Sequence, residues 1–107
     1  MTQGPEELVA RLWERFRPLV LSRVDTLESY AADLAAADPA KELSRADLAA
    51  AARAEEAAHN LVGALGSYGR PHGSDLALQI ETSLLSGAPE PAALAALVRE
   101  LRQEVTR

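Results

Sequence analysis

Prolines and glycines divide this 107-residue chain into segments of helical length. Between these breaks the sequence is rich in helix formers, because Ala occurs 22 times and Leu 17 times, whereas Val and Ile together occur seven times. Ala and Leu lose little conformational freedom in a helix, and β-branched residues suit strands better. The sequence therefore predicts an all-α fold. A chain of this length has room for one hydrophobic core, so we expect residues 1–107 to form a single domain.

Two prolines predict how the N-terminal third is divided. Pro5 suits the start of a helix, where a missing N–H costs nothing, and the two acidic residues after it meet the positive end of the helix dipole. Pro18 fits the first turn of a helix but not its interior. We therefore expect a short first helix from Pro5 to about Arg17, and a second helix from Pro18 that ends before Pro39.

Three further helices are expected, and their ends carry recognisable signals. The first opens on Ser44-Arg45-Ala46-Asp47, a capping box with Asp in place of Glu, and it ends at Gly69, which can take the left-handed conformation of a helix C-cap. Short connections between amphipathic helices favour antiparallel neighbours. The expected architecture is an antiparallel up-and-down four-helix bundle with an additional short N-terminal helix. Its last three helices are expected at Ser44–Tyr68, at Gly73–Ser86, and from Pro89 or Pro91 to the region of Val105.

The net charge of −5 and the lack of cysteine exclude several kinds of function. Proteins that bind nucleic acids concentrate Lys and Arg on one surface, so no DNA or RNA partner is expected. A chain without cysteine forms no disulfide and offers no thiol nucleophile or thiolate zinc ligand.

No segment approaches the roughly 20 apolar residues of a membrane span, and the N-terminus has no basic stretch followed by an apolar one. We expect a cytoplasmic protein that does not bind a membrane.

His59 lies beside two glycines that a simple bundle would not need. Gly63 and Gly66 each cost about 1 kcal/mol relative to Ala in the middle of a helix. Residues four and seven positions after His59 lie on the same helical face as the histidine. The pattern predicts an exposed imidazole with free space beside it, which a bulky electrophile such as a phosphoryl group could approach. The alternative is that the glycines only allow close helix packing and that His59 has no role.

A local motif surrounds this histidine. The segment His59-Asn60-Leu61-Val62-Gly63, followed by Gly69, is similar to the pattern His-x-Leu-Lys-Gly with a second Gly six residues later. The spacing that accompanies this pattern is continued downstream by Leu76, Ala77, Ile80 and Glu81. The chain thus resembles the histidine-containing phosphotransfer (HPt) domains of two-component phosphorelays, in detail over residues 58–81.

The resemblance implies a phosphoryl carrier without kinase activity of its own. His59 would be the phosphoacceptor, through Nε2, and would carry the group between a histidine kinase or receiver aspartate and a response-regulator receiver domain. The chain would act as a monomer and need no cofactor, because the magnesium ion would come with the partner receiver. Glu81, 22 residues after the histidine, would accept a hydrogen bond from Nδ1 and orient the ring, while Gly63 would give the clearance. The alternative for Glu81 is a solvated surface carboxylate.

Charges near the histidine depart from the family pattern. Val62 replaces the Lys that would face the phosphoryl oxygens, and Glu55 and Glu56 add negative charge on the same face. Negative neighbours disfavour a phosphoryl dianion. The chain could therefore be a divergent, slower carrier, or a module that docks a receiver or kinase without phosphotransfer. Arg70, eleven residues after His59, could supply positive charge instead.

A docking surface for the partner is expected on the outward face of the same helix. An apolar patch on which a receiver helix could rest would be formed by Val62, Gly66, Ala52 and Leu48. Alternatively, Leu48 and Ala52 lie beneath the N-terminal helix.

Other chemistries are less well supported by the sequence. Glu56 and His59 form a Glu-x-x-His pair, but di-iron bundles need that pair twice, and Gly69 stands three residues before the other histidine, His72. No metal site is expected, and His72 is interpreted as a solvated residue of a Pro-Gly turn. Nothing in the sequence indicates the strained nucleophile turn of a Ser-His-Asp hydrolase.

Overall fold

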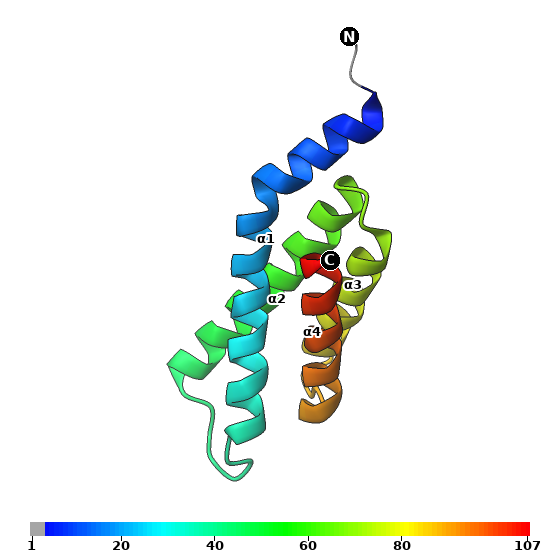
Figure 1. The fold of residues 1–107 in the computed structure, drawn as a ribbon. Coiled ribbons are helices and arrows are strands. Elements are labelled where there is room, and N and C mark those ends of the chain that lie inside the picture. The colour runs from blue at the N-terminus through cyan, green and yellow to red at the C-terminus, as the bar shows by residue number, and fades with distance from the viewer. Residues whose placement is uncertain (1–3) are drawn as a thin grey trace.

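Four helices make up most of residues 4–107, the part of the chain that this computed structural model describes (Figure 1). No strand occurs in this part, so the prediction of an all-α fold is confirmed. None of the four helices is long and apolar enough to cross a membrane. The helices are α1 (Pro5–Ala36), α2 (Arg45–Ser67), α3 (Pro71–Leu85) and α4 (Pro91–Thr106).

The first helix runs through Pro18 without a break. The 32 residues of α1 include the segment expected to form a separate N-terminal helix, so the predicted boundary between Arg17 and Pro18 is wrong. Proline removes one helical hydrogen bond and crowds the preceding turn, which bends a helix when packing holds both sides in place. Trp13 and Val20 are both buried, on either side of the proline. Figure 1 shows the N-terminal turns of α1 bending away from the rest of the helix.

The ends of the other helices follow local signals in the sequence. Ser44 caps α2 through the predicted capping box with Asp47. Gly69 and Gly87 have φ values of 72° and 80°, the left-handed conformation that terminates α2 and α3. Two starts were misplaced or left open: α3 begins at Pro71 instead of Gly73, and α4 begins at Pro91. Proline suits the first helical position in both cases.

The helices pack around one apolar core. Helix α1 contacts α2 and α4, and α3 contacts the same two helices. In Figure 1 the colour gradient runs downward along α1, upward along α2, downward along α3 and upward along α4. The largest fully buried side chains, which come from all four helices, are Leu27, Leu61, Leu65, Ile80, Leu94, Leu101, Val20, Val24 and Val105. Because α3 and α4 have 15 and 16 residues, they cover only part of the longer α1 and α2.

The capping box at the start of α2 gives a testable pH dependence. The Ser44 backbone N–H donates to the Asp47 carboxylate over 2.8 Å, and the bonds to Ser44 hold the pKa of Asp47 below its ordinary value of 3.8. A carboxyl group with a lowered folded-state pKa stabilises the fold above its unfolded pKa, and this stabilisation is lost as the pH falls through the folded value. We expect the stability advantage of the wild type over Asp47→Ala to be constant near neutral pH and to shrink in acid below about pH 4. Thermal unfolding followed by circular dichroism at a series of pH values measures it, and a difference independent of pH would contradict the prediction.

Candidate functional site

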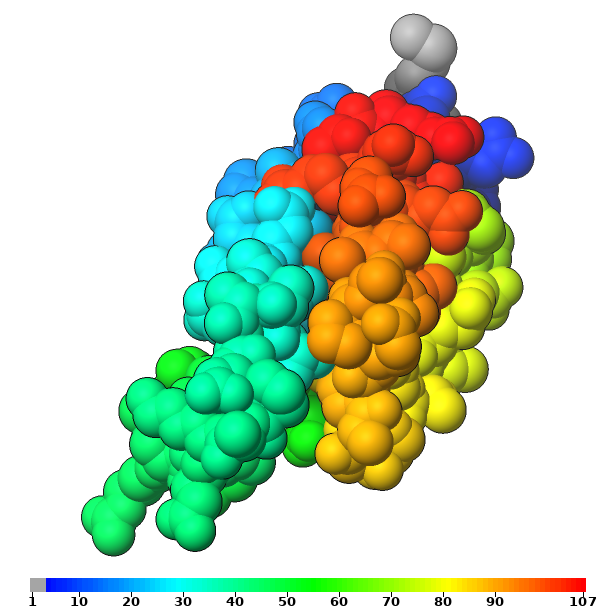
Figure 2. Space-filling view, turned by 90° about the horizontal axis from the view of Figure 1, so that it is seen from below, coloured from blue at the N-terminus to red at the C-terminus, as the bar shows by residue number. Residues whose placement is uncertain are grey.

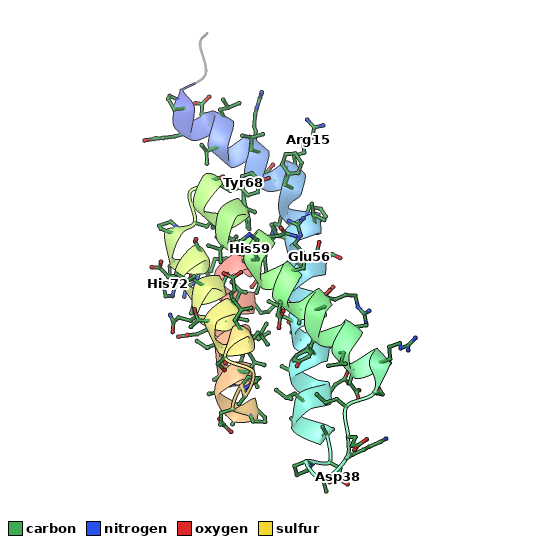
Figure 3. The ribbon with its side chains drawn as sticks, turned by 180° about the vertical axis from the view of Figure 1, so that it is seen from behind. Arg15, Asp38, Glu56, His59, Tyr68 and His72 are labelled. Atoms are coloured by element: carbon green, nitrogen blue, oxygen red, sulfur yellow. The ribbon has the colours of Figure 1, made fainter. Side chains whose placement is uncertain are left out.

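His59 projects from the middle of α2 into solvent. Its side chain is 75% exposed, whereas Ala58 and Leu61 on the other side of the helix are fully buried. Figure 3 shows His59 with Glu56 one turn before it and Tyr68 toward the end of the helix. The alternation arises because α2 is amphipathic, with an apolar stripe that faces the core. The predicted exposure of the imidazole is confirmed.

One ring nitrogen of His59 is held by a carboxylate of the neighbouring helix. Nδ1 lies 2.7 Å from Oε2 of Glu81 on α3, and the Glu81 side chain is only 15% exposed. The buried neighbour Ile80 fixes this part of α3 against the core. The predicted contact between His59 and Glu81 is confirmed, and the interpretation of Glu81 as a solvated surface residue is wrong.

The contact determines which nitrogen is free to react. An ionised carboxylate can only accept a hydrogen bond, so Nδ1 carries the proton and its N–H donates a hydrogen bond to Glu81. Neutral imidazole then has its lone pair on Nε2, and within residues 4–107 no hydrogen bond engages that atom. A carboxylate in this position orients the ring and increases the basicity of the opposite nitrogen. The arrangement suits His59 as a nucleophile at Nε2.

The two glycines after His59 have different surroundings. Apart from its chain neighbours and the backbone of its own helix, a Cβ added at Gly63 would meet no atom within 4 Å, so the predicted free space beside the imidazole is present. A Cβ at Gly66 would lie 3.6 Å from Oγ of Ser74 on α3. Gly63 therefore leaves open space, whereas Gly66 lies at the contact between α2 and α3.

Ser74 was not singled out in the sequence, although it links the two helices that carry the site. Its hydroxyl donates to the backbone carbonyl of Val62 over 2.7 Å, one helical turn after His59. Ser74 also precedes Glu81 by two turns of α3, so both residues lie on the face of α3 that meets α2. The bond thus helps to fix the register in which Glu81 reaches His59. The sequence feature that could have identified Ser74 is its spacing of seven residues from Glu81, which places both on one face of a helix.

Removing this hydroxyl should loosen the site. We expect Ser74→Ala to lower the free energy of unfolding by about 1 kcal/mol, because one part-buried hydrogen bond is lost. The exposed Ser29→Ala serves as a control that should leave stability unchanged. Denaturant unfolding measures the effect, and imidazole NMR signals of His59 should broaden only in Ser74→Ala. Equal stability of the two variants would be evidence against the register role.

Arg70 does not face the histidine. Its guanidinium lies 4.2 Å from the ring centroid of Trp13, and one of its nitrogens donates to the backbone carbonyl of Glu104 over 3.0 Å. Both contacts anchor the start of α3 to α1 and α4. The suggestion that Arg70 supplies positive charge beside His59 is therefore wrong, because its cation–π contact and hydrogen bond direct it elsewhere.

The expected docking residues divide into exposed and half-buried positions. Leu48 and Ala52 are exposed, so the alternative that they lie beneath the N-terminal turns is wrong. Those turns instead contact the other end of α2, where the side chain of Val9 approaches Gly69. Val62 is half-buried and packs against the core. The outward face of α2 that carries His59 therefore offers Leu48, Ala52 and the exposed Gly66, but little of Val62.

Acidic groups border the histidine on its own helix. Glu56 is exposed and Glu55 is half-buried, one turn before His59.

The other histidine, His72, is exposed in the first turn of α3. Within residues 4–107 no three His, Cys, Asp or Glu side chains come together as a metal site would require.

The chain was also compared with known proteins, and no protein family, no curated protein and no solved structure matches it.

Proposed function

We propose that this chain is an HPt-type phosphotransfer protein whose phosphoacceptor is Nε2 of His59. The observation that carries the proposal is the 2.7 Å contact between Nδ1 and Glu81, which leaves the other nitrogen of a 75% exposed ring free. Space beside the ring at Gly63 admits the phosphoryl group and the side chain that delivers it.

The transfer needs no base on this chain. The Nε2 lone pair attacks phosphorus of a receiver's aspartyl phosphate, the bond from phosphorus to the aspartate oxygen breaks, and the aspartate leaves as a carboxylate. The Nδ1 proton stays in place, so the phosphorylated ring carries a positive charge next to the Glu81 carboxylate. This charge pairing favours the phosphorylated state, and the reverse sequence returns the group to an aspartate. Glu81 thus acts as a positioning residue that also balances charge.

The partner supplies the rest of the chemistry. Phosphoryl transfer depends on charge neutralisation by metal ions and cationic groups. Near His59 the chain offers Glu55 and Glu56, with Val62 where the family has Lys. We infer that a receiver domain brings the magnesium ion and the cations, that a histidine kinase or receiver is the donor, and that the chain has no kinase activity of its own.

The proposal also covers the helix topology, the oligomeric state and the location of the protein. We propose one antiparallel up-and-down bundle that acts as a monomer in the cytoplasm. The pairwise packing of α1 with α2 and α4, and of α3 with the same helices, supports this architecture.

A labelling experiment separates a carrier from a docking module. The wild type, incubated with phosphoramidate or a phosphorylated receiver, should acquire an acid-labile phosphoryl group, and His59→Gln should acquire none, while His72→Gln behaves as the wild type. A folded chain that binds a receiver but is never labelled would favour docking without phosphotransfer.

A further inference from the structure

The end of the molecule formed by the α1–α2 connection is not covered by the other two helices. Figure 2 shows this cyan-to-green part projecting beyond the yellow and orange parts, α3 and α4. Two large apolar side chains are exposed there, Leu43 at 72% and Leu48 at 57%. Covering an exposed leucine with another apolar surface lowers the free energy of the system.

A groove of about 460 Å³ runs between the C-terminal end of α1 and the first turns of α2. Its apolar lining is provided by Tyr30, Leu34, Leu43, Leu48 and the alanines at 36, 37, 50 and 51. Leu34 and Tyr30 are half-buried and rest on the core, so the floor is fixed, while Leu43 and Leu48 stand at the rim. The shape suits the apolar face of one helix, which fills such a groove with side chains at helical spacing.

The rim of the groove is acidic. Four exposed acidic residues are among those that line the groove, against one exposed Lys41: Asp33, Asp38, Glu42 and Asp47. The pKa of the half-buried Tyr30 hydroxyl is raised by burial and by the negative charges of Glu55 and Asp47. A cationic partner is therefore attracted to this groove, and an anionic one is repelled.

We propose that this groove binds a basic amphipathic helix of a partner protein, with leucine-like side chains on one face and Lys or Arg beside them. A second copy of the chain fits less well, because each copy has a net charge of −5 and would bring further negative charge to an acidic rim. The groove lies toward the N-terminal end of α2, away from the histidine: Ala51 precedes His59 by eight residues, about 12 Å along the helix, and Leu48, which also belongs to the outward face of α2, precedes it by eleven. A partner helix in the groove leaves His59 accessible, and the proposal does not depend on phosphotransfer.

Synthetic peptides provide the probe. The full chain is titrated with a peptide of about 14 residues, roughly 21 Å long as a helix, with Leu on one face and Lys on the other. Two controls are a peptide of the same composition in scrambled order and a Leu/Glu peptide with the same apolar face. We expect binding of the Leu/Lys peptide alone, with NMR shifts concentrated at Tyr30, Leu34 and Leu48. Its affinity should fall when salt is raised from about 50 mM to about 500 mM.

Variants locate the binding site. Leu48→Gln should weaken binding about tenfold, whereas Leu85→Gln, a leucine 64% exposed at the end of α3, should leave it unchanged. The pair Asp33→Asn and Glu42→Gln should also weaken binding and reduce its salt dependence. Circular dichroism checks that each variant stays folded. The proposal would be overturned if Leu48→Gln bound with wild-type affinity, or if the scrambled or Leu/Glu peptide bound equally well. It would also be overturned if no peptide bound, or if the free chain formed a dimer that Leu48→Gln dissolves.

Discussion

The Gly63→Leu variant is expected to be at least as stable as the wild type and to accept no phosphoryl group at His59. The position is exposed, and no atom of another helix lies within 4 Å of an added Cβ, so a larger side chain creates no clash inside the fold. Replacing a mid-helix glycine by a better helix former adds up to about 1 kcal/mol of stability. The leucine side chain, however, extends toward the turn that carries His59 and fills the space that a phosphoryl group needs.

Gly63→Ala is the matched control for this prediction. A single methyl group gains most of the helix propensity but occupies little of the space, so we expect this variant to keep much of the labelling rate. Thermal unfolding and the rate of phosphorylation by phosphoramidate are measured on all three proteins. Labelling of Gly63→Leu at the wild-type rate would show that the clearance has no part in the reaction.

Replacing Glu81 by Ala is expected to slow phosphoryl transfer by about 10- to 100-fold, as for other carboxylates that orient an imidazole. Without the carboxylate, Nδ1 has no acceptor at 2.7 Å, so the proton can move to Nε2 and block the reacting lone pair. The positive charge of the phosphorylated ring also loses its partner. Global stability should fall by about 1 kcal/mol or less, because the loss is one hydrogen bond to the exposed His59 ring.

Glu81→Gln and Glu100→Ala are the controls. The amide oxygen of glutamine still accepts a hydrogen bond from Nδ1, so Glu81→Gln should recover part of the rate, and the exposed Glu100→Ala should match the wild type. NMR of the histidine nitrogens reports the tautomer and should show a shift toward Nε2–H only in Glu81→Ala. An unchanged tautomer combined with a wild-type rate would rule out the positioning role.

Much of the fold could be predicted because its helix ends depend on local chemistry. The capping box at Ser44 and the left-handed Gly69 act within a few residues, and the structure has them where expected. Pro18 behaved differently, because packing of Trp13 and Val20 on both sides outweighs its local preference.

The site was predicted in part for the same reason. Exposure of His59 follows from the periodicity of one helix, and the position of Glu81 was implied by a resemblance in spacing. Neither periodicity nor motif spacing could predict the other contacts between helices. Arg70 is drawn to Trp13, and Ser74 finds the Val62 carbonyl, only once the tertiary packing brings them together.

Phosphorus NMR of the chain, isotopically labelled at its histidine nitrogens and treated with phosphoramidate, tests the role of His59 most directly. We expect one protein-bound phosphorus resonance that is coupled to Nε2 of His59, while Nδ1 keeps its proton. A phosphorus atom coupled to Nδ1 of His59 or to His72, or a chain that remains unmodified, would contradict the proposed phosphoacceptor.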